Sequence, residues 1–216
     1  MQRVTNRLKA LSELSILLLI DIISIICIFM LAVMLRAEIL PGIFPTMWNE
    51  PFSMNYSQIW WVPLIWLFLF LYEGLYTKRF SFWDEIKTLW KASFFAAITV
   101  FTIVSIGKLS PDVSRTLIVL MWLISLPILP SIRVSAKNIL RGTGLFSRKA
   151  LIIGAGETGV LILKALRNEP NYGYKITGFI DDAISQDVRY IDGIKVHKGI
   201  TRIEDYIRRC NIRDIF

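Results

Sequence analysis

A glycine-rich turn at residues 154–159 is the segment whose residue types and spacing best fit a chemical task. It follows the short apolar run 151–153 and reads Gly154, Ala155, Gly156, Glu157, Thr158, Gly159. In a strand–turn–helix unit, the first glycine allows the tight turn and the second lets a pyrophosphate approach the backbone. The third lets the helix pack closely on the strand. The N–H groups that open the helix favour an anion.

Two acidic residues, Asp181 and Asp182, follow the next predicted strand, residues 175–180. A predicted helix over residues 160–167 connects the two strands, which makes a βαβ unit. An acid at this place holds a ribose hydroxyl in dinucleotide-binding proteins. The candidate ligand is therefore a nucleotide, and the candidate cofactor-binding residues are Gly154, Gly156, Glu157, Thr158, Gly159, Asp181 and Asp182.

A purely architectural glycine turn is the alternative interpretation. Glu157 places a carboxylate near the position that phosphates would take, and like charges repel. Further along, residues 193–196 and 212–216 predict strands, and residues 201–209 predict a helix. The pattern predicts a Rossmann-like α/β domain whose sheet is incomplete, because a doubly wound sheet needs more elements to close its core.

Four apolar runs precede the glycine turn, in a chain that is 54% hydrophobic. They cover residues 14–35, 56–76, 92–107 and 117–132. About 20 apolar residues span a bilayer, so the pattern predicts a four-helix transmembrane region. Two prolines, Pro127 and Pro130, predict a kink or break near the end of the fourth helix.

The predicted domains are a four-span transmembrane anchor, residues 1–145, and a truncated Rossmann-like domain of the nucleotide-binding type, residues 146–216. Lysine and arginine are frequent before the first run, absent from residues 37–58 and frequent again in residues 77–91. This alternation predicts that both termini lie in the cytoplasm. The net charge of +8 favours contact with anionic lipid over nucleic acid, because the basic residues flank the apolar runs.

Asp21 lies well inside the first apolar run. A lone carboxylate is costly there, so Asp21 is expected to face other helices. A helix–helix hydrogen bond is favoured over a lipid or ion contact. Cys27, Cys210 and the single His197 lack the spacing of metal ligands, so no metal site is predicted.

Several segments together resemble the large polyprenyl-phosphate sugar-1-phosphate transferases of the bacterial inner membrane. They are the four runs, residues 82–87, residues 141–148, the glycine turn and residues 178–182. The resemblance implies a reaction that moves a sugar phosphate from a UDP-sugar to undecaprenyl phosphate and releases UMP. Such enzymes start the synthesis of O-antigen, capsule or exopolysaccharide.

In that family the N-terminal half is an anchor and a dimerisation or regulatory module. The resemblance therefore implies contact with the lipid bilayer and polyprenyl phosphate, and a homodimer. The chemistry resides in a C-terminal domain with a magnesium-binding Asp-Glu pair, and that domain is absent from the sequence. Magnesium is implied only for the missing domain. We expect the chain to be a fragment ending at Phe216, with no catalytic residue and no activity of its own.

Two other functions fit parts of the same pattern. One is the N-terminal part of a membrane-anchored nucleotide-sugar dehydratase or epimerase, which shares the spans and the glycine turn. The other is a nucleotide-gated membrane transport protein. Residues 82–87 favour the transferase over the dehydratase, and the sequence has no filter-like segment that would favour a channel.

Overall fold

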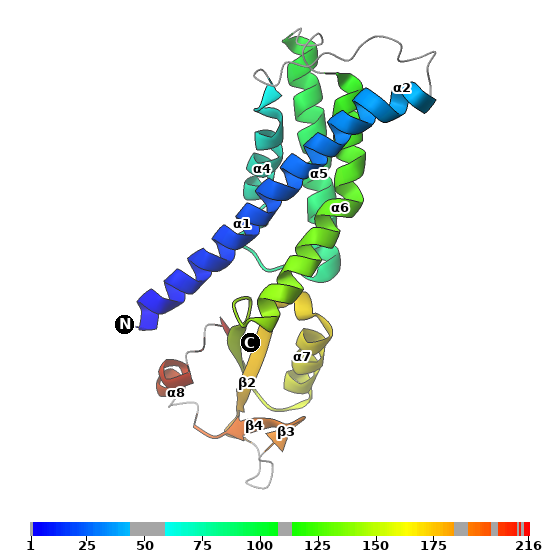
Figure 1. Ribbon diagram of the computed structural model, residues 1–216. Coiled ribbons are helices and arrows are strands. Elements are labelled where there is room, and N and C mark those ends of the chain that lie inside the picture. The colour runs from blue at the N-terminus through cyan, green and yellow to red at the C-terminus, as the bar shows by residue number, and fades with distance from the viewer. Residues whose placement is uncertain are drawn as a thin grey trace. The chain divides into compact units, whose positions relative to one another are not determined.

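The computed structural model describes residues 2–43, 59–107, 114–183, 190–199, 203–210, 212 and 214–216 of the chain. The chain divides into two compact units. One is Leu11–Ala136, and the other combines Met1–Ala10 with Lys137–Phe216. Figure 1 shows that helices make up the first unit and that a strand-containing domain makes up most of the second.

The first unit is a helix bundle. It contains most of α1 (Gln2–Met34), the π-helical turn η1 (Leu35–Ile39), α2 (Leu40–Ile43), α4 (Val62–Tyr72), α5 (Phe82–Ile106) and most of α6 (Arg115–Gly142). Among the described residues, three segments are long and apolar enough to cross a membrane: Leu11–Ile43, Phe82–Ile106 and Arg115–Gly142. The prediction of a membrane region is thus confirmed for three of its four helices.

The second predicted span is different in the structure. Helix α4 has 11 residues, which is about 16 Å of helix against a hydrocarbon core of about 30 Å. The helix does not continue to Tyr76 as predicted, because a turn follows Tyr72 and Gly74 adopts a φ of +77°. Residues 56–58 of the predicted span lie outside the described residues.

The core of the bundle follows a helical period along α5. Its buried positions recur every three or four residues: Leu89, Ala92, Ala96, Val100 and Val104. Small side chains at such positions let helices approach closely in a membrane. Trp66 and Phe70 of α4 fill the same core, and both are fully buried.

Helix α6 continues through Pro127 and Pro130, so the predicted break in this helix is wrong. Pro130 has no N–H to donate to the carbonyl of Leu126, four residues earlier. The indole N–H of Trp90, on α5, donates to that carbonyl oxygen at 2.9 Å. A neighbouring helix therefore satisfies the acceptor that the proline leaves open, as membrane helices require.

We expect Trp90→Phe to lower the free energy of unfolding by about 0.5–1.5 kcal/mol, because the carbonyl of Leu126 loses its donor. Thermal unfolding of the chain in detergent would measure the change. Trp83→Phe is the matched control, since Trp83 is more exposed and its ring contacts Phe82 edge-on. Equal effects of the two variants would contradict a specific role for the hydrogen bond.

The second unit contains a five-stranded sheet with the order β3–β4–β2–β1–β5. Its elements are β1 (Arg148–Ile153), α7 (Glu157–Asn168), the 3-10 turn η2 (Pro170–Tyr172), β2 (Tyr174–Ile180), β3 (Tyr190–Ile191), β4 (Ile194–His197), α8 (Ile203–Cys210) and β5 (Asp214–Ile215). Strands β4, β2, β1 and β5 pair in parallel, and β3 is antiparallel to β4.

Alternating side chains of the central strands bury the two faces of this sheet. Ile152 and Phe179 face α7 together with Leu163, whereas Leu151 and Ile180 pack with residues of α8. Figure 1 accordingly shows α7 and α8 on opposite sides of β2. The predicted strands and helices of this unit are thus present, with ends shifted by a few residues.

The short antiparallel strand β3 was not predicted. A two-residue turn connects it to β4, with φ values of 48° at Asp192 and 78° at Gly193. Two successive residues with positive φ are typical of the type I′ hairpin turn, and Asp-Gly is a preferred pair for it. The Asp-Gly pair was therefore the available signal for the hairpin.

Candidate functional site

The glycine turn lies between the end of β1 and the start of α7. Gly154 has a φ of +92°, a conformation that side chains disfavour. A Cβ on Gly159 would lie 2.1 Å from the carbonyl oxygen of Gly154, whereas a Cβ on Gly156 would meet nothing within 4 Å. The predicted steric roles of Gly154 and Gly159 are confirmed, and Gly156 has open space beside it.

The acidic pair at the end of β2 bonds to the backbone of its own chain. Asp181 accepts the N–H of Ala155 at Oδ2, at 2.7 Å, and the N–H of Ala183 at Oδ1, at 2.8 Å. Asp182 accepts the N–H of Gly199 at 2.5 Å. The sequence predicts ribose contacts for this pair, and the structure places Asp181 directly on the glycine turn.

The remaining predicted site residues, Glu157 and Thr158, lie exposed on the first turn of α7. They share this turn with Gly159. The structure thus brings Asp181 and the glycine turn together, whereas Asp182 bonds to Gly199, on the segment that follows β4. Nucleotide binding by these residues stays a prediction.

His197 ends β4 beside the same edge of the sheet. Its backbone carbonyl accepts the N–H of Asp181 at 3.1 Å, and its Nε2 lies 2.6 Å from the hydroxyl oxygen of Tyr206 on α8. Burial, with a smaller contribution from Lys195, lowers the pKa of His197. Burial also raises the pKa of Tyr206. A neutral imidazole can therefore accept a hydrogen bond from the Tyr206 hydroxyl, which connects α8 to the sheet.

The helix bundle contains a buried ion cluster that joins α1, α5 and α6. We use this name for Asp21, Glu85, Arg133 and Tyr76. Arg133 donates from Nε to Asp21 Oδ1 at 3.0 Å, from Nη2 to Asp21 Oδ2 at 2.5 Å, and from Nη1 to Glu85 Oε1 at 3.0 Å. The hydroxyl of Tyr76 donates to Asp21 Oδ2 at 2.6 Å.

Water has little access to this cluster. Asp21 and Arg133 are each 1% exposed and Glu85 is 2% exposed. The guanidinium also lies 5.1 Å from the centre of the Tyr76 ring, a favourable cation–π distance. The expectation that Asp21 faces other helices is confirmed, and its partner is an arginine as well as a tyrosine.

The basic residues that flank the apolar runs are predicted to contact anionic lipid, and for Arg133, which directly follows the fourth run, this prediction is wrong because its side chain is buried. Helix α6 extends to Gly142, and its buried positions continue as Leu129, Arg133, Ala136 and Leu140. This helical period beyond residue 132 was the signal that Arg133 faces the core. Similarly, Arg79 lies within the bundle and pairs with Glu13 of α1 at 3.1 Å.

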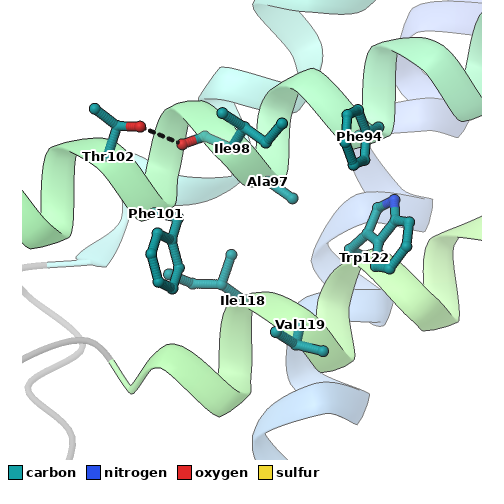
Figure 2. A pocket seen from close by; sticks show the side chains of 8 residues that line it. All are labelled: Phe94, Ala97, Ile98, Phe101, Thr102, Ile118, Val119 and Trp122. Atoms are coloured by element: carbon teal, nitrogen blue, oxygen red, sulfur yellow. Dashed lines mark hydrogen bonds between the residues drawn. The ribbon is translucent and has the colours of Figure 1, made fainter.

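An apolar groove of about 180 Å³ lies between α5 and α6. Figure 2 shows the rings of Phe94, Phe101 and Trp122 around it, with Ala97 on α5 between Phe94 and Phe101. The one hydroxyl in its lining, on Thr102, donates to the carbonyl of Ile98 in its own helix. The groove therefore offers hydrocarbon and aromatic surface within two of the candidate membrane spans.

These features define a membrane protein in which a helix bundle accompanies a five-stranded α/β domain with a glycine turn. The chain belongs to a family of CoA-binding domains, whose family model matches residues 72–216 and thus more than half of the chain. The matched part includes α5, α6 and the whole α/β unit.

The curated relatives that the chain matches include sugar transferases. An uncharacterised sugar transferase of Haemophilus influenzae is 36% identical over 118 residues, and a UDP-galactose-lipid carrier transferase of Erwinia amylovora is 32% identical over 126 residues. An undecaprenyl-phosphate galactose phosphotransferase of Salmonella typhimurium is 28% identical over 121 residues. The alignments cover 54%, 57% and 56% of this chain and 25% of each relative, so the chain spans a minor part of their length. The resemblance to polyprenyl-phosphate sugar transferases is confirmed.

The family's description implies a ligand with a nucleotide pyrophosphate, and the glycine turn fits one in two respects. The positive φ of Gly154 and the open space at Gly156 leave backbone accessible at the start of α7. Gly154, Gly156 and the first turn of α7 would hold the phosphates, and the ligand would supply negative charge to the helix terminus. The Asp181 carboxylate already bonds to this turn.

Proposed function

We propose that the chain is the membrane anchor and the regulatory or dimerisation module of an undecaprenyl-phosphate sugar-1-phosphate transferase. The enzyme would take a UDP-sugar, release UMP and start the synthesis of O-antigen, capsule or exopolysaccharide. The observation that carries the proposal is the similarity to sugar transferases over more than half of the chain, two of them named for a lipid carrier or for undecaprenyl phosphate.

The architecture supports an anchoring role. Three candidate spans provide the attachment to a bilayer, and we propose that the shorter apolar helix α4 completes a four-helix region. The alternation of positive charge supports a bacterial inner-membrane protein with both termini in the cytoplasm. The α/β unit would then meet cytoplasmic nucleotides.

The strand order supports a Rossmann-like interpretation of residues 146–216. Strand β1 is central, β2 and β4 extend the sheet to one side, and β5 starts the other side. In doubly wound sheets, ligands bind where the order reverses in this way, at the carboxyl ends of the strands. The glycine turn follows β1 at that position.

Contact with lipid chains is the role that we propose for the outer surface of the bundle. Phe94, Ile98 and Phe101 are exposed large apolar side chains on α5 beside the groove. Such a surface is compatible with hydrocarbon and unfavourable in water. We propose that the surface meets the bilayer and the polyprenyl phosphate that the enzyme uses, and that the assembled protein is a homodimer.

The proposal is tested with the 216-residue chain and with a longer chain in which residues 1–216 are followed by the catalytic domain that the proposal requires. Membranes containing each protein would receive labelled UDP-galactose and undecaprenyl phosphate, and label in lipid and released UMP would be measured. We expect transfer by the longer chain and none by the 216-residue chain. Transfer by the 216-residue chain alone, or a longer chain that transfers no sugar phosphate from any UDP-sugar, would contradict the proposal.

A further inference from the structure

Asp181 and a ligand phosphate would use the same backbone donor of the glycine turn. We propose that the Asp181 carboxylate caps this turn as an internal competitor of a nucleotide pyrophosphate, so that a ligand binds only when Asp181 releases the N–H of Ala155. The sequence-based expectation is the opposite, because it assigns the acid at this place to holding the ligand.

The hydrogen bonds of the turn support this proposal. The N–H of Gly154 donates to the carbonyl of Ile180 at 2.8 Å, and the N–H of Ala155 donates to Asp181 Oδ2 at 2.7 Å. The end of β2 thus takes both of these donors. Phosphates at glycine-rich turns are held by such backbone N–H groups. A pyrophosphate that used the N–H of Ala155 would have to displace the carboxylate.

The position of Asp181 explains why it can act as a cap. Its second oxygen accepts the N–H of Ala183, only two residues further along the chain. This local bond holds the carboxylate in place without a ligand. A carboxylate at the start of a helix also provides the negative charge that the helix terminus favours, as a phosphate would. Asp181 therefore replaces the ligand both as an acceptor and as a charge.

Asp182 supplies a matched control for the charge. It is adjacent in the chain and carries the same charge, but its recorded partner is the N–H of Gly199. Removal of either acid makes the surroundings of the turn less negative by one charge. Only removal of Asp181 frees the N–H of Ala155. The two variants therefore separate competition for a donor from general repulsion.

The test measures equilibrium binding of coenzyme A and, separately, of UDP-galactose to the full chain in detergent. We expect Asp181→Ala to bind at least one of them about tenfold or more tightly than the unchanged chain, because a hydrogen bond to a charged group no longer competes. We expect Asp182→Ala to stay within about threefold of the unchanged chain, since long-range effects between exposed charges are small. The two ligands distinguish a CoA-type source of the pyrophosphate from a UDP-sugar.

Weaker binding by Asp181→Ala would overturn the proposal and would favour the sequence-based prediction that Asp181 holds a ribose hydroxyl of the ligand. An equal gain in affinity in both variants would show that charge alone matters, and absence of binding by all three proteins would also overturn the proposal.

Hydrogen–deuterium exchange of the unchanged chain at saturating ligand is a second test, and it needs no variant. We expect Ala183 to lose protection while Ala155 keeps it, and unchanged protection at Ala183 would contradict the displacement. The inference does not depend on the transferase function, because binding is measured without sugar transfer.

Discussion

We expect Arg133→Met to lower the free energy of unfolding of the helix bundle by about 3–5 kcal/mol, which is the range for breaking one partner of a buried ion pair. Methionine keeps the length of the side chain but removes its charge and its donors. Asp21 and Glu85 would then be left as carboxylates without their shared cation. Both are nearly inaccessible to water, so neither can be resolvated in place.

Denaturant-induced unfolding of the purified chain in detergent would measure this loss. Lys87→Met is the matched control, because Lys87 lies at the surface of the same bundle and is 4.0 Å from Asp84, with most of its side chain exposed. Exposed pairs of this kind contribute about 0–1 kcal/mol. Similar losses in the two variants would show that the buried ion cluster contributes no more than a surface pair.

A second variant separates the effect of losing the cation on stability from the effect of changed packing. The triple change Asp21→Asn, Glu85→Gln and Arg133→Met removes all three charges while keeping the approximate volumes. Replacement of a whole buried ionic group is often neutral or stabilising, unlike the removal of one partner. We therefore expect the triple variant to be more stable than Arg133→Met alone. A triple variant that is less stable would show that the packing of methionine, not the unpaired carboxylates, causes the loss.

Much of the α/β unit could be predicted because its signals are local. The glycine spacing, the apolar run before it and the acid pair after β2 all lie within about 30 residues, the size of a βαβ unit. The run of four apolar segments was equally visible, since hydropathy reports the demand of the bilayer for continuous apolar helix. What failed in the membrane unit was the extent of α4 and the expectation of a helix break at Pro127 and Pro130.

The partners of Asp21 could not be predicted in the same way. Arg133 is 112 positions from Asp21 in the chain, and Tyr76 is 55 positions away. The cost of burying Asp21 indicates that a partner exists, but the choice of partner depends on how the helices pack. The break at the prolines was wrongly expected for the same reason, because Trp90 lies on another helix and satisfies the carbonyl that Pro130 leaves open.

Asp181 shows a different limit of the sequence. An acid that holds a ribose and an acid that caps the turn occupy the same position after β2, so the pattern that predicts the ribose contact does not exclude a cap. The structure distinguishes them for the chain without ligand, because Oδ2 is bonded to the N–H of Ala155. Whether a ligand displaces this bond depends on the relative free energies of the two states.

The second large effect is expected at the third glycine of the turn. Gly159→Ala should lower the free energy of unfolding of the α/β unit by about 3 kcal/mol or more, at or above the upper end of the range for an overpacked core. The introduced Cβ would lie 2.1 Å from the carbonyl oxygen of Gly154. That oxygen belongs to the backbone, so no change of side-chain rotamer can relieve the contact.

The contrast with Gly156→Ala makes this expectation specific. Alanine is favoured over glycine by about 1 kcal/mol inside a helix, so propensity alone would make Gly159→Ala stabilising. Gly156 has a φ of −77° and open space at its Cβ, and we expect its replacement to lose less than about 1 kcal/mol, from the poorer N-cap. Circular dichroism during thermal unfolding would compare the two variants. A Gly159→Ala protein as stable as Gly156→Ala would mean that β1 and α7 can separate at little cost, and the close approach at the glycine turn would then not be what holds this unit together.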